Sequence, residues 1–344
     1  MAKKAKSTFN YKEEVTALKT AGPERLYLLY GPEDYLRERY LEELKQICVP
    51  DGAEFSYKRL NGPSIDLSDL SEAVNALPFF TERTLVELRD YDINHCRDEE
   101  AERLKAILGD IPDYCTVVFV VSSSYDIDGR LSAAKLLKKL GRAIEFTEQE
   151  GNALTQWVAS RFRALGKQIS REDIEHLIFL SGNRMNSLIS EIEKLAAHAA
   201  GEIVTREEID AVASRVPEAD VFRMAELLSL RDVERAAAIL SNLLTDKDNH
   251  PIKLNALIAN QMRRLYAVKI GLDAGKARKD VMDLAGIRFD SIFDKLAASA
   301  RRYSTEQLGK IVTLCADYDF RMKSTGLDAY DLMIELFARI AAGV

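Results

Sequence analysis

The sequence of 344 residues lacks several features that define large classes of protein. It has no run of 18 apolar residues, so we expect no membrane span. Its N-terminus, MAKKAKSTFNYKEE, has basic residues but no apolar segment behind them, and it does not predict a secretory signal. The cysteines lie far apart without a CxxC pair, which predicts reduced thiols of a cytosolic protein, neither disulfides nor zinc ligands: Cys48, Cys96, Cys115 and Cys315.

A lysine is also missing from a segment that otherwise has the order of a nucleotide site. LYLLYGPEDYLRERY begins at Leu26 and predicts a strand, a glycine turn and an amphipathic helix. A working P-loop reads G-x-x-x-x-G-K-[ST], because its lysine and hydroxyl reach the phosphates and the magnesium ion. After Gly31 there is no second glycine, no lysine and no such hydroxyl. Glu33 and Asp34 stand there instead and would repel phosphate, so we expect no cofactor.

Charge is unevenly distributed along the chain. The net charge of −7 argues against a protein that coats nucleic acid, yet the stretch from Lys253 to Lys310 has 12 Lys/Arg against 6 Asp/Glu. This stretch could contact phosphates, or it could be a solvated helix face paired with neighbouring acids. DNA-binding residues therefore stay unassigned, with these candidates: Arg263, Arg264, Arg301, Arg302 and Lys323.

Strands and helices alternate over residues 1–149, which predicts a mostly parallel sheet. The run CTVVFVV is continuous and apolar, as expected of a strand buried on both faces. The expected strands are Leu26–Tyr30, Glu54–Leu60, Thr84–Leu88, Cys115–Val121 and Ala143–Phe146. The expected helices are Asp34–Cys48, Asp66–Ala76, Asp98–Leu108 and Leu131–Leu140.

The pattern changes near Thr147, and we expect no strand after it. Short helices fill residues 150–214 and predict a small helical domain. Pro217 marks a second boundary, and longer amphipathic helices fill residues 215–344, among them Leu254–Leu272 and Tyr330–Ala342. Three domains are therefore predicted, 1–149, 150–214 and 215–344.

Four strings in this order resemble one family, the delta subunits of the bacterial DNA polymerase III clamp loader. LYLLYGPEDYLRERY is similar to the family's opening strand and turn, with Gly-x-Glu-x-Tyr-Leu in place of the P-loop. NALPFFTERTLVEL resembles its segment of two apolar residues, a turn with arginine and a strand. RRLYAVKIGLDAG and DFRMKSTGLDAYDLMIEL resemble two signatures of its C-terminal domain.

The resemblance implies an α/β plus all-α fold. Its parts are an AAA+-like parallel-sheet domain that lacks a P-loop, a small helical lid domain and a C-terminal helical collar domain. It implies a subunit of the DNA-directed DNA polymerase (nucleotidyltransferase) holoenzyme that binds the β sliding clamp, favours the open ring and hydrolyses no ATP itself. The implied partners are the clamp, the gamma/tau and delta-prime subunits through the collar, and primed DNA in the assembled complex. The implied location is the bacterial cytoplasm, at the replisome.

The segment Leu77-Pro78-Phe79-Phe80 is the candidate binding site. Pro78 ends the preceding helix, because its ring forbids continuation. The phenylalanines then either form an exposed apolar knob or cap the local core. The resemblance assigns this place to a pocket on the clamp, with Phe80 and either Leu77 or Phe79 as anchors. The sequence leaves that choice open.

Three other functions are alternatives to this one. They are a nucleotide hydrolase with a degenerate P-loop, a delta-prime or gamma/tau subunit, and a DNA-binding regulator with a helical C-terminal half. Asp126 and Asp128 lie two residues apart, but no third ligand is near in sequence, so a loop is predicted there and no metal site. No catalytic residue is predicted.

Overall fold

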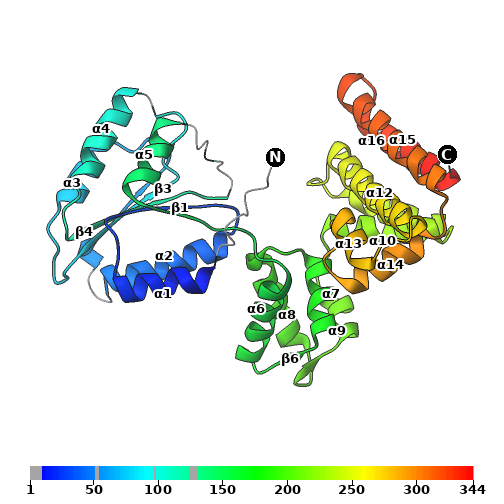
Figure 1. Cartoon of the computed structure of the whole chain (residues 1–344), viewed down its shortest axis with the longest axis horizontal. Helices are drawn as coiled ribbons and strands as arrows, with labels where there is room; N and C mark the ends of the chain where they lie inside the picture. Colours follow the sequence, from blue (N-terminus) through cyan, green and yellow to red (C-terminus); the bar gives the residue numbers. More distant parts are fainter. Residues whose placement is uncertain (1–9, 51–53, 97, 124–126, 128–130, 344) are drawn as a thin grey trace. The chain divides into compact units, whose positions relative to one another are not determined.

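The computed structural model describes residues 10–50, 54–96, 98–123, 127 and 131–343. It divides into two compact units, Met1–Gln149 with Arg184–Asn186, and Glu150–Asn183 with Ser187–Val344. The first unit is α/β and the second is almost entirely helical, which confirms the predicted fold class (Figure 1). The division of the second part into a lid (150–214) and a collar (215–344) stays a prediction.

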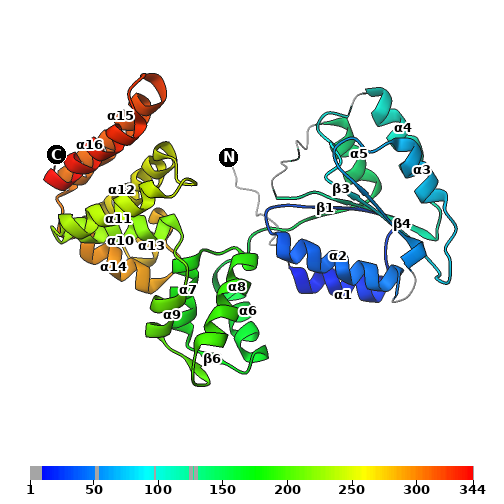
Figure 2. The same ribbon diagram turned by 180° about the vertical axis from the view of Figure 1, so that it is seen from behind.

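The first unit is built on a five-stranded sheet with the order β2-β3-β4-β1-β5, in which each neighbouring pair is parallel. Helices α1 and α2 cover one face, and α3, α4 and α5 cover the other (Figures 1 and 2). The strands are β1 (Leu26–Tyr30), β2 (Tyr57–Asn61), β3 (Thr84–Arg89), β4 (Cys115–Val120) and β5 (Arg142–Glu145). The helices are α1 (Tyr11–Ala21), α2 (Asp34–Cys48), α3 (Leu67–Asn75), α4 (Asp98–Gly109) and α5 (Ser132–Leu140).

Local sequence explains most of these elements. Every residue of β4 is buried, as the apolar run predicts for a strand with helices on both sides. Helix α3 begins where the side chain of Asp66 accepts a hydrogen bond from the N–H of Ser68, which satisfies a free amide of the first turn. The largest shift from a predicted boundary in this unit is at the start of the second strand. The expected strand from Glu54 starts only at Tyr57, because Glu54–Ser56 forms a 3₁₀ turn, η1.

The helical unit contains eleven helices among its described residues. They are α6 (Gly151–Ala164), α7 (Arg171–Ser181), α8 (Met185–His198), α9 (Arg206–Val212), α10 (Pro217–Ser229), α11 (Val233–Thr245), α12 (Pro251–Asp273), α13 (Arg278–Ala285), α14 (Asp290–Ala300), α15 (Thr305–Ser324) and α16 (Ala329–Ala342). The expectation of no strand after Thr147 was wrong, because β6 (Gln168–Ile169) pairs with β7 (Ile203–Val204). Two residues are too few to show a strand periodicity in sequence.

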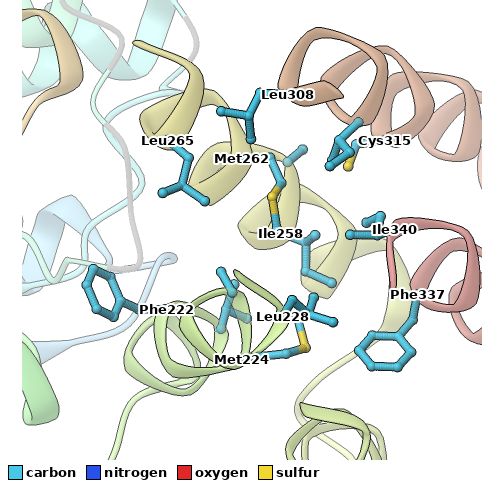
Figure 3. Packing of buried hydrophobic residues seen from close by; sticks show 14 of the residues in the cluster. Phe222, Met224, Leu228, Ile258, Met262, Leu265, Leu308, Cys315, Phe337 and Ile340 are labelled. Carbon is cyan, nitrogen blue, oxygen red and sulfur yellow. The ribbon is translucent and has the colours of Figure 1, made fainter. Parts of the chain in front are cut away.

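The largest apolar core of this unit surrounds α12 (Figure 3). Ile258, Met262 and Leu265 of α12 are at most 1% exposed. They pack among side chains of α10, α15 and α16, which include Met224, Cys315 and Ile340 (Figure 3). Within the described ranges, no helix has the length and apolar character that a membrane span requires.

Candidate functional site

The loop between α3 and β3 carries the predicted apolar anchors on its surface. Helix α3 ends at Asn75, and the chain becomes extended at Ala76. The exposed fraction is 76% for Leu77, 54% for Phe79 and 87% for Phe80. Large apolar residues are usually more buried than this, so capping of the local core does not account for them. The sequence left open whether Leu77 or Phe79 points outward, and both side chains are exposed.

The backbone of Phe80 is held in an unusual conformation. Its φ is +60°, in the left-handed region that costs an L-residue roughly 1–2 kcal/mol. The rings of Phe79 and Phe80 meet edge to face, with centroids 4.3 Å apart and planes at 65°. Such a conformation persists only where the surrounding structure enforces it, and it is concentrated at functional sites.

The hydroxyl of Ser56, at the end of η1, holds this loop in place. Ser56 is 3% exposed, and its Oγ accepts a 2.9 Å hydrogen bond from the N–H of Phe79 and donates one of 3.0 Å to the carbonyl of the same residue. The hydroxyl of Thr81 lies 2.7 Å from this Oγ and 2.8 Å from the carbonyl oxygen of Arg83, so its single proton goes to one of the two. A segment more than twenty residues earlier in the chain therefore fixes the loop.

Phe55 extends the apolar surface and was missed by the sequence reasoning. It is 87% exposed, and its ring centroid lies 6.1 Å from that of Phe79, with planes at 80°. The sequence predicted that Phe55 lies in a strand whose side chains alternate between core and solvent. A phenylalanine that points outward is not unusual in such a strand. The signal that could have identified it was a phenylalanine at the start of a mostly polar segment.

The turn between β1 and α2 has the place of a P-loop but a different chemistry. Glu33 is the N-cap of α2, and its carboxylate accepts a 3.2 Å hydrogen bond from the N–H of Tyr35. The side chain is buried, and this burial raises the pKa of Glu33 to about 6. A helix N-terminus attracts anions. Here a carboxylate of the chain itself occupies the position that a phosphate takes in a nucleotide site.

The neighbouring Asp34 is also engaged within the protein. Its carboxylate accepts hydrogen bonds from the N–H of Ser123 at 3.2 Å and from its hydroxyl at 2.6 Å, and it pairs with the buried Arg37. Although burial raises the pKa of Asp34, the hydrogen bonds from Ser123 and Arg37 outweigh this and hold it below its usual value. The guanidinium of Arg37 also donates to the carbonyl of Gly31 at 2.9 Å. The cation of this turn therefore binds the chain itself and is not free for a phosphate.

The acid that follows β3 is structural as well. Asp90 has a φ of +53°, and its carboxylate accepts a 2.8 Å hydrogen bond from the N–H of Ser122 at the end of β4. No group of three or more His, Cys, Asp or Glu side chains in the described part of the chain could hold a metal ion. Asp126 and Asp128 lie outside the described residues.

Several cations of the basic stretch are paired with acids. Arg278 contacts both Asp290 and Asp294, at 2.8 and 2.7 Å. Lys269 and Lys310 pair with acids on their own helices. These pairs fit a solvated, charge-paired helix face, the alternative to contact with DNA phosphates.

Fold and site together define an α/β unit with a parallel five-stranded sheet, whose first strand is followed by carboxylates where a nucleotide site has phosphate ligands, joined to a helical unit. A family model of DNA polymerase III, delta subunit, matches residues 27–148, and a model of the delta subunit's C-terminal domain matches residues 218–339. The chain belongs to the DNA polymerase III delta subunits, which are clamp-loader components of a polymerase holoenzyme. This membership removes the DNA-binding regulator and the other subunits of the same complex as alternatives.

Relatives match along nearly the whole chain. DNA polymerase III subunit delta of Bacillus subtilis (strain 168) is 27% identical over 335 residues, 93% of this chain and 94% of the relative. The probable DNA polymerase III subunit delta of Aquifex aeolicus is 25% identical, over 84% of this chain and 83% of its own. The solved structure of the Bacillus subtilis DNA clamp loader delta protein is similar with a TM-score of 0.51 and 23% identity, and the match covers 97% of this chain and all of that one. This last likeness supports the fold.

Proposed function

We propose that this delta subunit binds the β sliding clamp through Leu77, Phe79 and Phe80 and favours the open form of the ring. The observation that carries the proposal is the exposure of these three apolar side chains on a loop that buried hydrogen bonds hold in place. Exposed aromatic anchors on a rigid support are the residues that dominate binding energy when a partner pocket covers them.

The proposed mechanism is differential binding. A subunit that binds an open or strained clamp more tightly than a closed one shifts the ring toward the open state, by no more than its difference in affinity for the two states. No covalent step is needed. The carboxylates of Glu33 and Asp34 and the absence of a P-loop lysine support a role without ATP hydrolysis, which leaves that reaction to neighbouring subunits.

The remaining partners in this proposal are the gamma/tau and delta-prime subunits, which contact the collar, and primed DNA in the assembled loader. The hairpin of α15 and α16 supports the collar contact, because it exposes Phe320, Leu327 and Ile334 by 70%, 56% and 57%. Apolar groups of this size on one hairpin are typical of a protein interface. The location in this proposal is the bacterial cytoplasm, at the replisome.

The first test is binding of the purified chain to the sliding clamp of the same replication system. Surface plasmon resonance would compare the wild type with the Leu77→Ala/Phe80→Ala variant, and circular dichroism would verify that both are folded. We expect the folded variant to lose at least about a hundredfold in affinity, since two central anchors are removed.

A matched control is available in the same unit. Ile47 and Leu140 are also exposed apolar residues, by 38% and 43%, but lie on α2 and α5, outside the loop. The Ile47→Ala/Leu140→Ala variant should bind like the wild type. A wild type that does not bind the clamp would overturn the proposed function, and equal binding by the loop variant would overturn the choice of residues.

A further inference from the structure

We propose that the clamp-binding surface is built from two chain segments, with Phe55 as a further contact residue and Ser56 as the residue that positions the loop. This inference rests on the proposed function and extends it beyond the loop of residues 77–80. It assigns the segment before β2, which has no part in the sequence signature, to the same partner.

The three aromatic rings form one row on the surface. The centroid of Phe79 lies 6.1 Å from that of Phe55 and 4.3 Å from that of Phe80, and each pair meets edge to face. The two outer rings are each 87% exposed, while the middle ring is 54% exposed. Phe55 therefore lies beside Phe79, where a partner that covers the loop can contact it. The partner is the protein that covers the loop, the clamp, with an apolar pocket that accepts the edges of aromatic rings.

The two segments are joined by a buried hydroxyl. Ser56 follows Phe55 directly, and its Oγ bonds both the N–H and the carbonyl of Phe79. Removing the hydroxyl leaves two backbone groups of the loop without their partner and frees the strained backbone of Phe80 to relax. A loop that is ordered before binding loses less entropy on binding, so the hydroxyl should contribute to affinity without touching the clamp.

The first experiment measures the dissociation constant of the full chain and the clamp for Phe55→Ala and Phe55→Trp. We expect Phe55→Ala to weaken binding roughly fivefold to thirtyfold, as removal of a contact at a hot spot does. Phe55→Trp keeps an aromatic contact and should stay within about threefold of the wild type. The control Leu140→Ala truncates an exposed apolar residue outside the row and should change nothing. Wild-type affinity in Phe55→Ala overturns the role of Phe55.

The second experiment separates positioning from contact. Ser56→Ala should weaken binding roughly fivefold in the wild-type background and have a clearly smaller effect in a Phe79→Ala/Phe80→Ala background, because two of the three anchors that it positions are then absent. An equal effect in both backgrounds overturns the positioning role. Should Ser56→Ala prevent folding, Thr81→Val removes the neighbouring hydroxyl of the same network and should show the same dependence.

The outcomes distinguish this inference from the function on which it rests. If the wild type does not bind the clamp, the proposed function fails and this inference fails with it. If the wild type binds and Leu77→Ala/Phe80→Ala does not, while Phe55→Ala and Ser56→Ala bind normally, the proposed function stands and only the two-segment surface fails.

Discussion

The turn after β1 brings Gly31 against the backbone of Phe146, at the end of β5. A Cβ atom on Gly31 would lie 2.5 Å from the carbonyl oxygen of Phe146. That same oxygen accepts a 3.0 Å hydrogen bond from the N–H of Glu33, and the N–H of Phe146 donates one of 2.7 Å to Tyr30. The glycine of this turn is therefore required by packing between neighbouring segments, with or without a phosphate.

Replacing Gly31 by alanine should destabilise the first unit strongly. Gly31 has a φ of +117°, which an L-residue rarely adopts, and the added methyl group would clash with backbone that cannot move aside. We expect a loss of roughly 3 kcal/mol or more in the free energy of unfolding. Urea unfolding followed by circular dichroism measures it.

Gly62 provides the matched control for this prediction. Its φ is +102°, but a Cβ atom there would meet nothing within 4 Å. The loss of unfolding free energy in Gly62→Ala therefore measures the backbone strain alone. The additional loss in Gly31→Ala measures the clash with Phe146. Equal losses in the two variants would contradict the packing role of Gly31.

Burial of the Glu33 carboxyl should make stability depend on pH. The pKa of Glu33 is raised from 4.5 to about 6 by burial, so the folded state binds the proton more tightly than the unfolded state. The contribution of this group is present below about pH 4.5 and is lost as pH rises through about 6. Glu33→Gln stays neutral, so its stability relative to the wild type should rise by at most about 2 kcal/mol between pH 4.5 and pH 7.5.

Urea unfolding at several pH values between 4.5 and 7.5 tests this prediction. Glu42→Gln, an exposed position on the same helix, serves as the control for the charge change itself. A stability difference between Glu33→Gln and the wild type that is the same at every pH would show that burial does not raise the pKa of this carboxyl.

The backbone of Phe80 predicts an unusual order of two truncations. At a φ of +60°, glycine is free of the strain that alanine suffers, so Phe80→Gly should be more stable than Phe80→Ala by about 1 kcal/mol. At Phe79 the order should be reversed, because glycine there only adds flexibility to the unfolded chain. Thermal unfolding of the four variants measures their order of stability. If the alanine variant is the more stable one at both positions, the strain assigned to the backbone of Phe80 is contradicted.

The chain should not bind ATP. Carboxylates occupy the N-terminus of α2, and Arg37 is already bound to Asp34 and to the carbonyl of Gly31. We expect isothermal titration with Mg-ATP to give a dissociation constant weaker than about 1 mM. An ATP-hydrolysing subunit of the same loader is the positive control. Saturable binding with a dissociation constant below about 1 mM would support the alternative function of a nucleotide hydrolase with a degenerate P-loop.

The α15–α16 hairpin should be needed for assembly with the other loader subunits. Ile334→Asp places a charge in an exposed apolar surface and should weaken subunit association at least about tenfold, because a buried, unpaired carboxylate is costly. Leu284→Asp is a matched control, since Leu284 is also 57% exposed but lies on α13. Native mass spectrometry of mixtures with the gamma/tau and delta-prime subunits measures association. Full assembly of Ile334→Asp would exclude the hairpin as the contact.

Periodicity in the sequence predicted the elements that have strong apolar patterns. The strand Leu26–Tyr30 and the helix Asp34–Cys48 have the predicted bounds. Residues with weak patterns were predicted less well. Glu54–Ser56 alternates like a strand but forms a 3₁₀ turn, from which the hydroxyl of Ser56 bonds the distant backbone of Phe79. No local pattern records such a bond.

Local patterns in the sequence are enough to predict that this chain is α/β and then helical, that its P-loop position lacks phosphate ligands, and where its apolar loop lies. These properties follow from composition and from short-range periodicity, which act within a few residues of the chain. Three findings required the folded structure. Leu77, Phe79 and Phe80 are all exposed, Phe55 lies beside Phe79, and the carboxylates of Glu33 and Asp34 accept hydrogen bonds from the chain itself. Exposure and partnership depend on segments that folding brings together from distant positions, and a sequence read locally does not contain their distances.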